Sequence, residues 1–159
     1  MSAQPSPVAH HDDAPSPRFL VVDSRVPGPI RQLLDEADGC LNMSFVTGGT
    51  ACARRAIDHI LTTEQAFADD FAASLLMLSE KHPAVAPALF KILAMLGDGD
   101  DALTTESLNA LIATVKAVVY EIYVLGAERI ERLMYVHQLV ECLKSDTPGA
   151  HQGSPPSRN

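Results

Sequence analysis

The last third of this chain contains a long stretch in which apolar residues recur every three or four positions. From Leu108 onward they form a face wide enough to pack against several other helices, and the pattern resumes beyond Gly126. Thr104 or Thr105 can cap the start of this helix, which extends to about Leu143. Gly126 either bends it or separates two helices. A central helix of this kind predicts an all-α fold.

Four shorter segments before it also have helical spacing. Pro29 is suited to the first position of a helix, Gly48-Gly49 breaks the chain before the second, and Pro83 closes the third. Thr62 and Gln65 have the spacing of a capping box at the start of the third. The inward stripe of the third segment is predicted at Phe67, Phe71, Leu75 and Leu78. The four segments cover about 29–42, 50–61, 63–82 and 84–96. The sequence therefore predicts an all-α bundle of about five helices with a long C-terminal helix.

Both ends of the chain have a different composition. Residues 1–18 and 146–159 are rich in proline and polar residues, so we expect two disordered tails around a helical domain at 19–145. The N-terminal residues lack the apolar region of a secretory signal. The chain also has no run of about 18 uninterrupted apolar residues, so no membrane span is predicted. The three cysteines are far apart and form no Cys-x-x-Cys motif. A cytoplasmic protein with reduced thiols is expected.

Charge limits the class of partner. The chain has 20 acidic against 12 basic residues and a net charge of −8, and the excess is not confined to the tails. No basic cluster is visible, and an acidic surface repels a phosphate backbone. The charge therefore disfavours nucleic acid as a partner class, and a protein or small molecule is expected.

No motif predicts a metal or a cofactor. His10-His11-Asp12-Asp13 lies in a tail without fixed geometry, and the run Asp98–Asp101 places Asn109 where a calcium loop needs glutamate. Thr47-Gly48-Gly49-Thr50 lacks the lysine of a phosphate-binding loop and is interpreted as a turn. His137 lies on the apolar stripe of the last helix, where a packed or interface residue is expected.

Several short motifs resemble one branch of the HEPN (higher eukaryotes and prokaryotes nucleotide-binding) superfamily. That branch is an uncharacterised domain also found appended to the motor subunits of type I restriction endonucleases. The motifs, in order, are Pro29-Ile30, Glu36-Ala37, Cys40 and Ala53-Arg54-Arg55-Ala56-Ile57-Asp58. Leu89–Leu96 and Leu108–Tyr123 resemble the two helices that flank the family's Gly-Asn-x-x-x-His turn. The resemblance implies a helical fold and a tendency to dimerise.

The catalytic motif of the superfamily is absent. Active members resemble metal-independent RNases with an Arg and a His four to six residues apart. Here Gly97-Asp98 stands where Gly-Asn is expected, no arginine lies between Lys91 and Arg129, and no histidine lies between Lys91 and Tyr135. Three aspartates in that turn would repel the scissile phosphate. The resemblance therefore supports a fold more than an activity.

The leading hypothesis is a non-catalytic protein-binding and dimerisation module, acting as a homodimer or with a protein partner. Family association places such a module in bacterial or phage defence or toxin–antitoxin systems. Arg54 or Arg55 is expected to pair with Asp35 or Glu36 across the first two helices. The candidate structural or binding residues are Arg54, Arg55, Glu36, Asp58, His59 and His137.

Two alternatives remain open. The first is an RNase or nucleotide-binding protein with a displaced site, which would use Arg54 or Arg55 together with His59 or His137. The second is a helical bundle of Bcl-2-like shape with a groove for a partner helix. A cleft that contains both an arginine and a histidine would favour the first alternative, and an exposed apolar groove would favour the second.

Overall fold

A computed structural model describes residues 23–98 and 102–145 of the chain. Their helices are α1 (Gly28–Asn42), α2 (Val46–Thr63), α3 (Phe71–Lys81), α4 (Pro87–Gly97), α5 (Thr105–Val119), the π-helix η2 (Tyr120–Leu125) and α6 (Gly126–Ser145). These residues contain no strand, which confirms the all-α fold with a long C-terminal helix. The predicted tails 1–18 and 146–159 lie outside the described residues.

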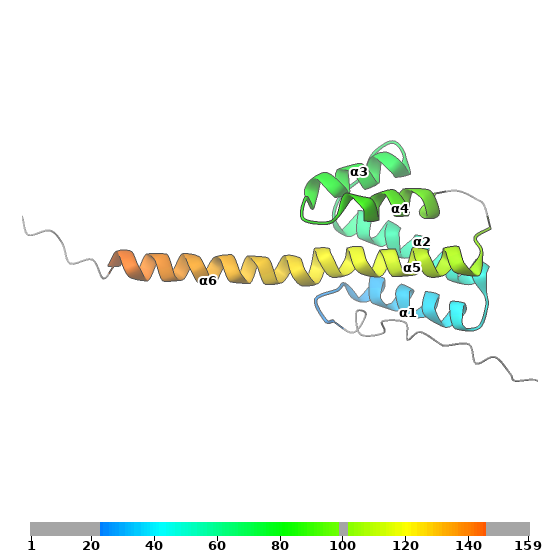
Figure 1. The fold of residues 1–159 in the computed structure, drawn as a ribbon, viewed down its shortest axis with the longest axis horizontal. Helices are drawn as coiled ribbons and strands as arrows, with labels where there is room; N and C mark the ends of the chain where they lie inside the picture. Colours follow the sequence, from blue (N-terminus) through cyan, green and yellow to red (C-terminus); the bar gives the residue numbers. More distant parts are fainter. Residues whose placement is uncertain (1–22, 99–101, 146–159) are drawn as a thin grey trace, which may run out of the picture.

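The helices form a bundle with one projecting arm. In Figure 1, α5 runs between α1 on one side and the pair α3 and α4 on the other, and α2 packs against both α1 and α5. The bundle's body thus comprises α1 to α5, and α6 continues the direction of α5 away from it. The described part of the chain therefore has a helical body and a long helical extension.

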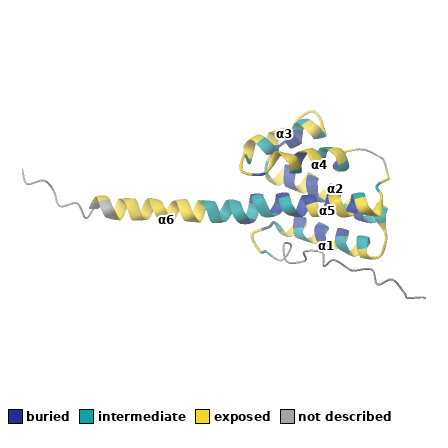
Figure 2. Cartoon of the chain, viewed as in Figure 1, coloured by how far each residue is buried: buried dark blue, intermediate teal, exposed yellow. Residues whose placement is uncertain are grey.

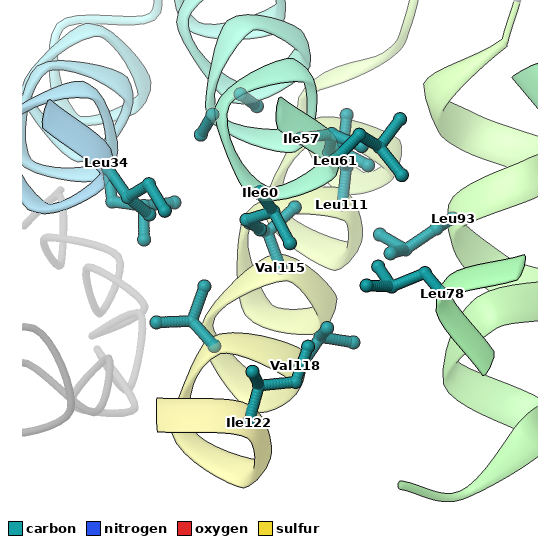
Figure 3. Close-up of a cluster of buried hydrophobic side chains, with 14 of the residues drawn as sticks. Leu34, Ile57, Ile60, Leu61, Leu78, Leu93, Leu111, Val115, Val118 and Ile122 are labelled. Carbon is teal, nitrogen blue, oxygen red and sulfur yellow. The ribbon is translucent and has the colours of Figure 1, made fainter. Parts of the chain in front are cut away.

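The core lies where the five helices of the body meet. Each contributes side chains that are at most 1% exposed, including Leu34, Ile57, Leu78, Leu93 and Val115 from α1 to α5 in order. Figure 3 shows these side chains pointing toward one another. Burial of apolar area at this meeting point is the main force that holds the helices together.

The predicted break at Gly48-Gly49 is wrong, because α2 already begins at Val46. Gly49 is buried where α2 meets α5, and a Cβ atom there would lie 2.7 Å from Cδ2 of Leu108. The glycine therefore permits close packing between helices rather than a turn.

The predicted start of α3 near residue 63 is also wrong. α2 continues to Thr63, and the chain then turns at Gln65, which has a positive φ of 54°. Asp70 caps α3 instead, since its side chain accepts a hydrogen bond of 2.7 Å from the backbone N–H of Ala73. Phe67 precedes the helix and is 61% exposed, so its predicted inward position is wrong.

The C-terminal helix is continuous from α5 through α6. The predicted cap is confirmed: Oγ1 of Thr104 accepts a hydrogen bond of 3.1 Å from the N–H of Ser107. Gly126 does not separate two helices; the wider turns of η2 connect α5 directly to α6. Figure 2 shows the change in burial along this helix, from buried in α5 to exposed in α6.

One ion pair links α5 to α1 inside the body. Nζ of Lys116 lies 2.5 Å from Oδ2 of Asp38, and the lysine side chain is only 4% exposed. Asp38 is partly exposed. The carboxylate is therefore the group that compensates a nearly buried positive charge.

Candidate functional site

The most unusual surface of the described chain is the arm α6. Every described side chain from Ile130 to Lys144 is exposed, although many of them are apolar. The large apolar residues are between 41% and 70% exposed; they are Ile130, Leu133, Met134, Tyr135, Val136, Leu139 and Val140. Single exposed apolar side chains are normal, but a contiguous set of this size is typical of an interaction surface.

The apolar residues of α6 are not confined to one stripe. Successive residues of an α-helix are about 100° apart, so Leu139 lies on the side of α6 opposite to Ile130. His137 lies close to the direction of Ile130, between Leu133 and Met134. A helix that is apolar on opposite sides is typical of one surrounded by other protein.

Ion pairs hold the base of α6 in place. Nη2 of Arg129 lies 3.0 Å from Oε2 of Glu121, across the last turn of η2. Nη1 of Arg25 lies 3.4 Å from Oε1 of Glu128, and Arg25 also binds Asp23. Hydrogen bonding by the Arg25 guanidinium lowers the pKa of Asp23 to about 2. Together with the continuous helix, these contacts give α6 a defined direction from the body.

The expected pairing of Arg54 or Arg55 with Asp35 or Glu36 is wrong for the described residues, in which neither arginine has a carboxylate within 4.0 Å. Glu36 instead accepts hydrogen bonds from Nε2 of Gln32 and from Sγ of Cys52. Burial is the main cause that raises the pKa of Cys52, and the Glu36 carboxylate adds to it. Facing helices alone do not bring these long side chains together.

The remaining candidate residues do not converge on one site. Arg54 is half-buried beside a cavity of about 280 Å³ at the start of α2, and no histidine lines that cavity. His59 is exposed farther along α2, and His137 lies on the arm. Asp58 borders a different surface cavity of about 440 Å³, near Phe67. The described residues also contain no group of three potential metal ligands.

A cluster of polar side chains lies where the ends of α2 and α3 approach η2. The sequence did not predict this cluster. Oε2 of Glu64 lies 2.8 Å from Nε2 of His82 and 3.8 Å from Nζ of Lys81. The Tyr123 hydroxyl is buried beside Glu64, without a partner in hydrogen-bond geometry among the described residues. The residues of this cluster come from three separate parts of the chain, so no local motif indicates them. We interpret this cluster as a structural contact that joins three elements.

Burial is the main cause that raises the pKa of Tyr123, and the negative charge of Glu64 adds to it. Below pH about 10 the phenol is neutral in both folded and unfolded chains. Above that pH the unfolded chain ionises first, so the free energy of unfolding falls as pH rises.

We therefore expect the free energy of unfolding to fall less between pH 9 and pH 11 in Tyr123→Phe than in the wild type. The difference should be at most about 1 kcal/mol, since the ring is partly exposed. Urea unfolding at both pH values measures this difference. Tyr135→Phe, on the exposed arm, is the control and should leave the pH dependence of the wild type unchanged. Equal alkaline losses in wild type and Tyr123→Phe would contradict the assignment.

The continuous helix over Thr105–Cys142 is long and apolar enough to cross a membrane, judged by length and composition alone. Half of its most apolar window is buried inside the protein. The core helix of a soluble bundle has the same property, so this observation is weak evidence for a membrane span.

Comparison with known proteins identifies no relative. No protein-family model, curated protein or solved structure matches the chain. The resemblance to the HEPN superfamily therefore stays a prediction.

Proposed function

We propose that this chain is a non-catalytic interaction module that forms a homodimer or binds a protein partner through α6. The observation that carries the proposal is the set of seven large apolar side chains on α6 that are 41% to 70% exposed. Burying one such side chain is worth about 1.5–3 kcal/mol, so water is a poor environment for all seven. A protein surface that covers them is the most favourable alternative.

The way α6 is attached supports this role. A free helix in water is costly to start, because its first turn fixes several residues for one hydrogen bond. In α6 that turn is supplied by η2 and the buried end of α5. The arm is thus a preformed surface, and a partner has little ordering entropy to overcome on binding.

The chemistry of the other candidates supports a non-catalytic module. The cavity beside Arg54 has no histidine in its lining, and no other acid or base lines it. The net charge of −8 disfavours the approach of RNA or a nucleotide. We accordingly propose neither a cofactor nor a metal, and no RNase activity. A cytoplasmic setting in bacterial or phage defence follows only from the proposed HEPN kinship.

Hydrogen exchange of the backbone amides in residues 130–142 tests the proposal. We expect slow exchange at high protein concentration and fast exchange on dilution, because only a second copy covers this arm in a pure sample. The amides of α5 are the internal control and should stay protected throughout, since they lie in the core. Fast exchange of residues 130–142 at every concentration would contradict self-association through α6.

A further inference from the structure

We infer that α6 pairs with the α6 of a second copy in antiparallel orientation, with the two-fold axis near His137. This inference rests on the proposed function, because it names the partner of the same surface and the direction in which that partner runs. The geometry starts from length: α6 has 20 residues and is about 30 Å long. Two arms can therefore overlap along their apolar parts while each body stays at its own end.

The distribution of charge favours a second copy. α6 contains three acidic residues and three basic residues, so its formal net charge is zero. The whole excess of −8 lies in the rest of the chain. Two copies thus repel one another through their other residues but not through their arms, which makes the arm the best place for a self-contact.

The same charges select the antiparallel direction. A parallel pair would place the two acidic bodies side by side, whereas an antiparallel pair separates them by about the length of the arm. That separation of about 30 Å exceeds the screening length of about 8 Å at physiological ionic strength. The opposed helix dipoles of an antiparallel pair favour the same arrangement.

The order of charged side chains along α6 also favours the antiparallel direction. Helical spacing places Glu141 and Lys144 on the side of His137 and turns Glu131 and Arg132 away from it. In a parallel pair with two-fold symmetry, Glu141 and Lys144 each lie level with their own copy, and like charges meet. In an antiparallel pair centred near His137, they lie level with Leu133 and Ile130 of the other copy, so like charges do not meet.

Cysteine cross-linking in the full chain tests this geometry, with Cys142→Ser as the background. His137→Cys lies near the proposed axis, so it should form a disulfide-linked dimer under mild oxidation. Ile130→Cys alone should not, because its copy is about 20 Å away along the helix. A mixture of Ile130→Cys and Lys144→Cys should cross-link, since these positions lie level and on the side of His137. Leu139→Cys, on the side of α6 opposite to Ile130, is the matched control and should stay uncrosslinked.

The outcomes separate this inference from the proposed function. Efficient cross-linking of Ile130→Cys alone would indicate a parallel pair, which overturns the antiparallel inference but leaves α6 as the interaction surface. Absence of every cross-link, together with fast exchange in α6, would overturn both. Binding of the unlinked monomer to phosphatidylcholine vesicles would assign the arm to a lipid surface and would also overturn the inference.

Discussion

Leu133→Glu is expected to weaken self-association by about a hundredfold or more in Kd while leaving the body folded. Among the described side chains of α6, Leu133 is the most exposed large apolar one, at 70%, so the single chain does not depend on it for packing. A symmetric dimer loses two buried leucines, each worth about 1.5–3 kcal/mol, and gains two charges at an apolar contact. A loss of about 3 kcal/mol corresponds to a factor of roughly a hundred in Kd.

Cys142→Glu is the matched control, because it adds the same charge at an exposed position nine residues away, on the side of α6 opposite to Leu133. It should change Kd by only a few fold. Circular dichroism of both dilute variants should match the wild type, which would show that both chains stay folded. If Leu133→Glu and Cys142→Glu weakened association equally, net charge rather than apolar contact would explain the effect.

Asp38→Ala is expected to lower the free energy of unfolding by about 2–4 kcal/mol. The substitution leaves the ammonium group of Lys116 nearly buried and without its carboxylate. Breaking a buried ion pair usually costs about 3–5 kcal/mol, and the partial exposure of Asp38 places this pair toward the lower end. Urea unfolding at one fixed protein concentration measures the change.

The exposed Asp35, on the same helix, provides the control: Asp35→Ala should change the free energy of unfolding by less than about 0.5 kcal/mol. The double variant Asp38→Ala with Lys116→Met should recover most of the lost stability, because it removes the unpaired charge as well. A cost of Asp38→Ala no greater than that of Asp35→Ala would show that the ion pair contributes nothing to stability.

Local signals in the sequence predicted most of the helices. Thr104 lies one turn before the apolar pattern that starts at Leu108, and it caps α5, as one of the two threonines predicted for this role. The start of the fourth helix, however, was predicted at residue 84, directly after Pro83, and this start is wrong. Pro87 begins α4, whereas Pro83 lies in the preceding turn. Either proline has a backbone suited to a first helical position, so the choice depends on packing of the finished bundle.

Glycine was the least reliable signal. Gly49 was interpreted as part of a turn, and Gly126 as a bend or a break in the last helix. Both lie within helical segments. Gly49 is explained by the closeness of Leu108, a contact between helices far apart in the sequence. Such contacts leave no local trace, so a glycine that permits close packing looks the same as a glycine that ends a helix.

The candidate site shows the same limit. The apolar pattern of residues 130–140 was visible in the sequence, but a pattern does not say which surface covers it. Only the structure shows that the body of the same chain leaves these side chains exposed. The contacts among Glu64, His82 and Tyr123 were equally hidden, since they join three separate elements. The pairing expected for Arg54 and Arg55 was wrong, and Glu36 instead accepts hydrogen bonds from Gln32 and Cys52.

Sedimentation equilibrium of the full wild-type chain over a wide range of concentrations tests the central claim most directly. The chain has a mass of 17.1 kDa, and the account predicts a reversible transition from this mass to twice this mass as concentration rises. The Leu133→Glu variant should stay at the lower mass over the same range. A wild-type chain that sediments as a monomer at every concentration would contradict the claim that α6 is an interface between two copies.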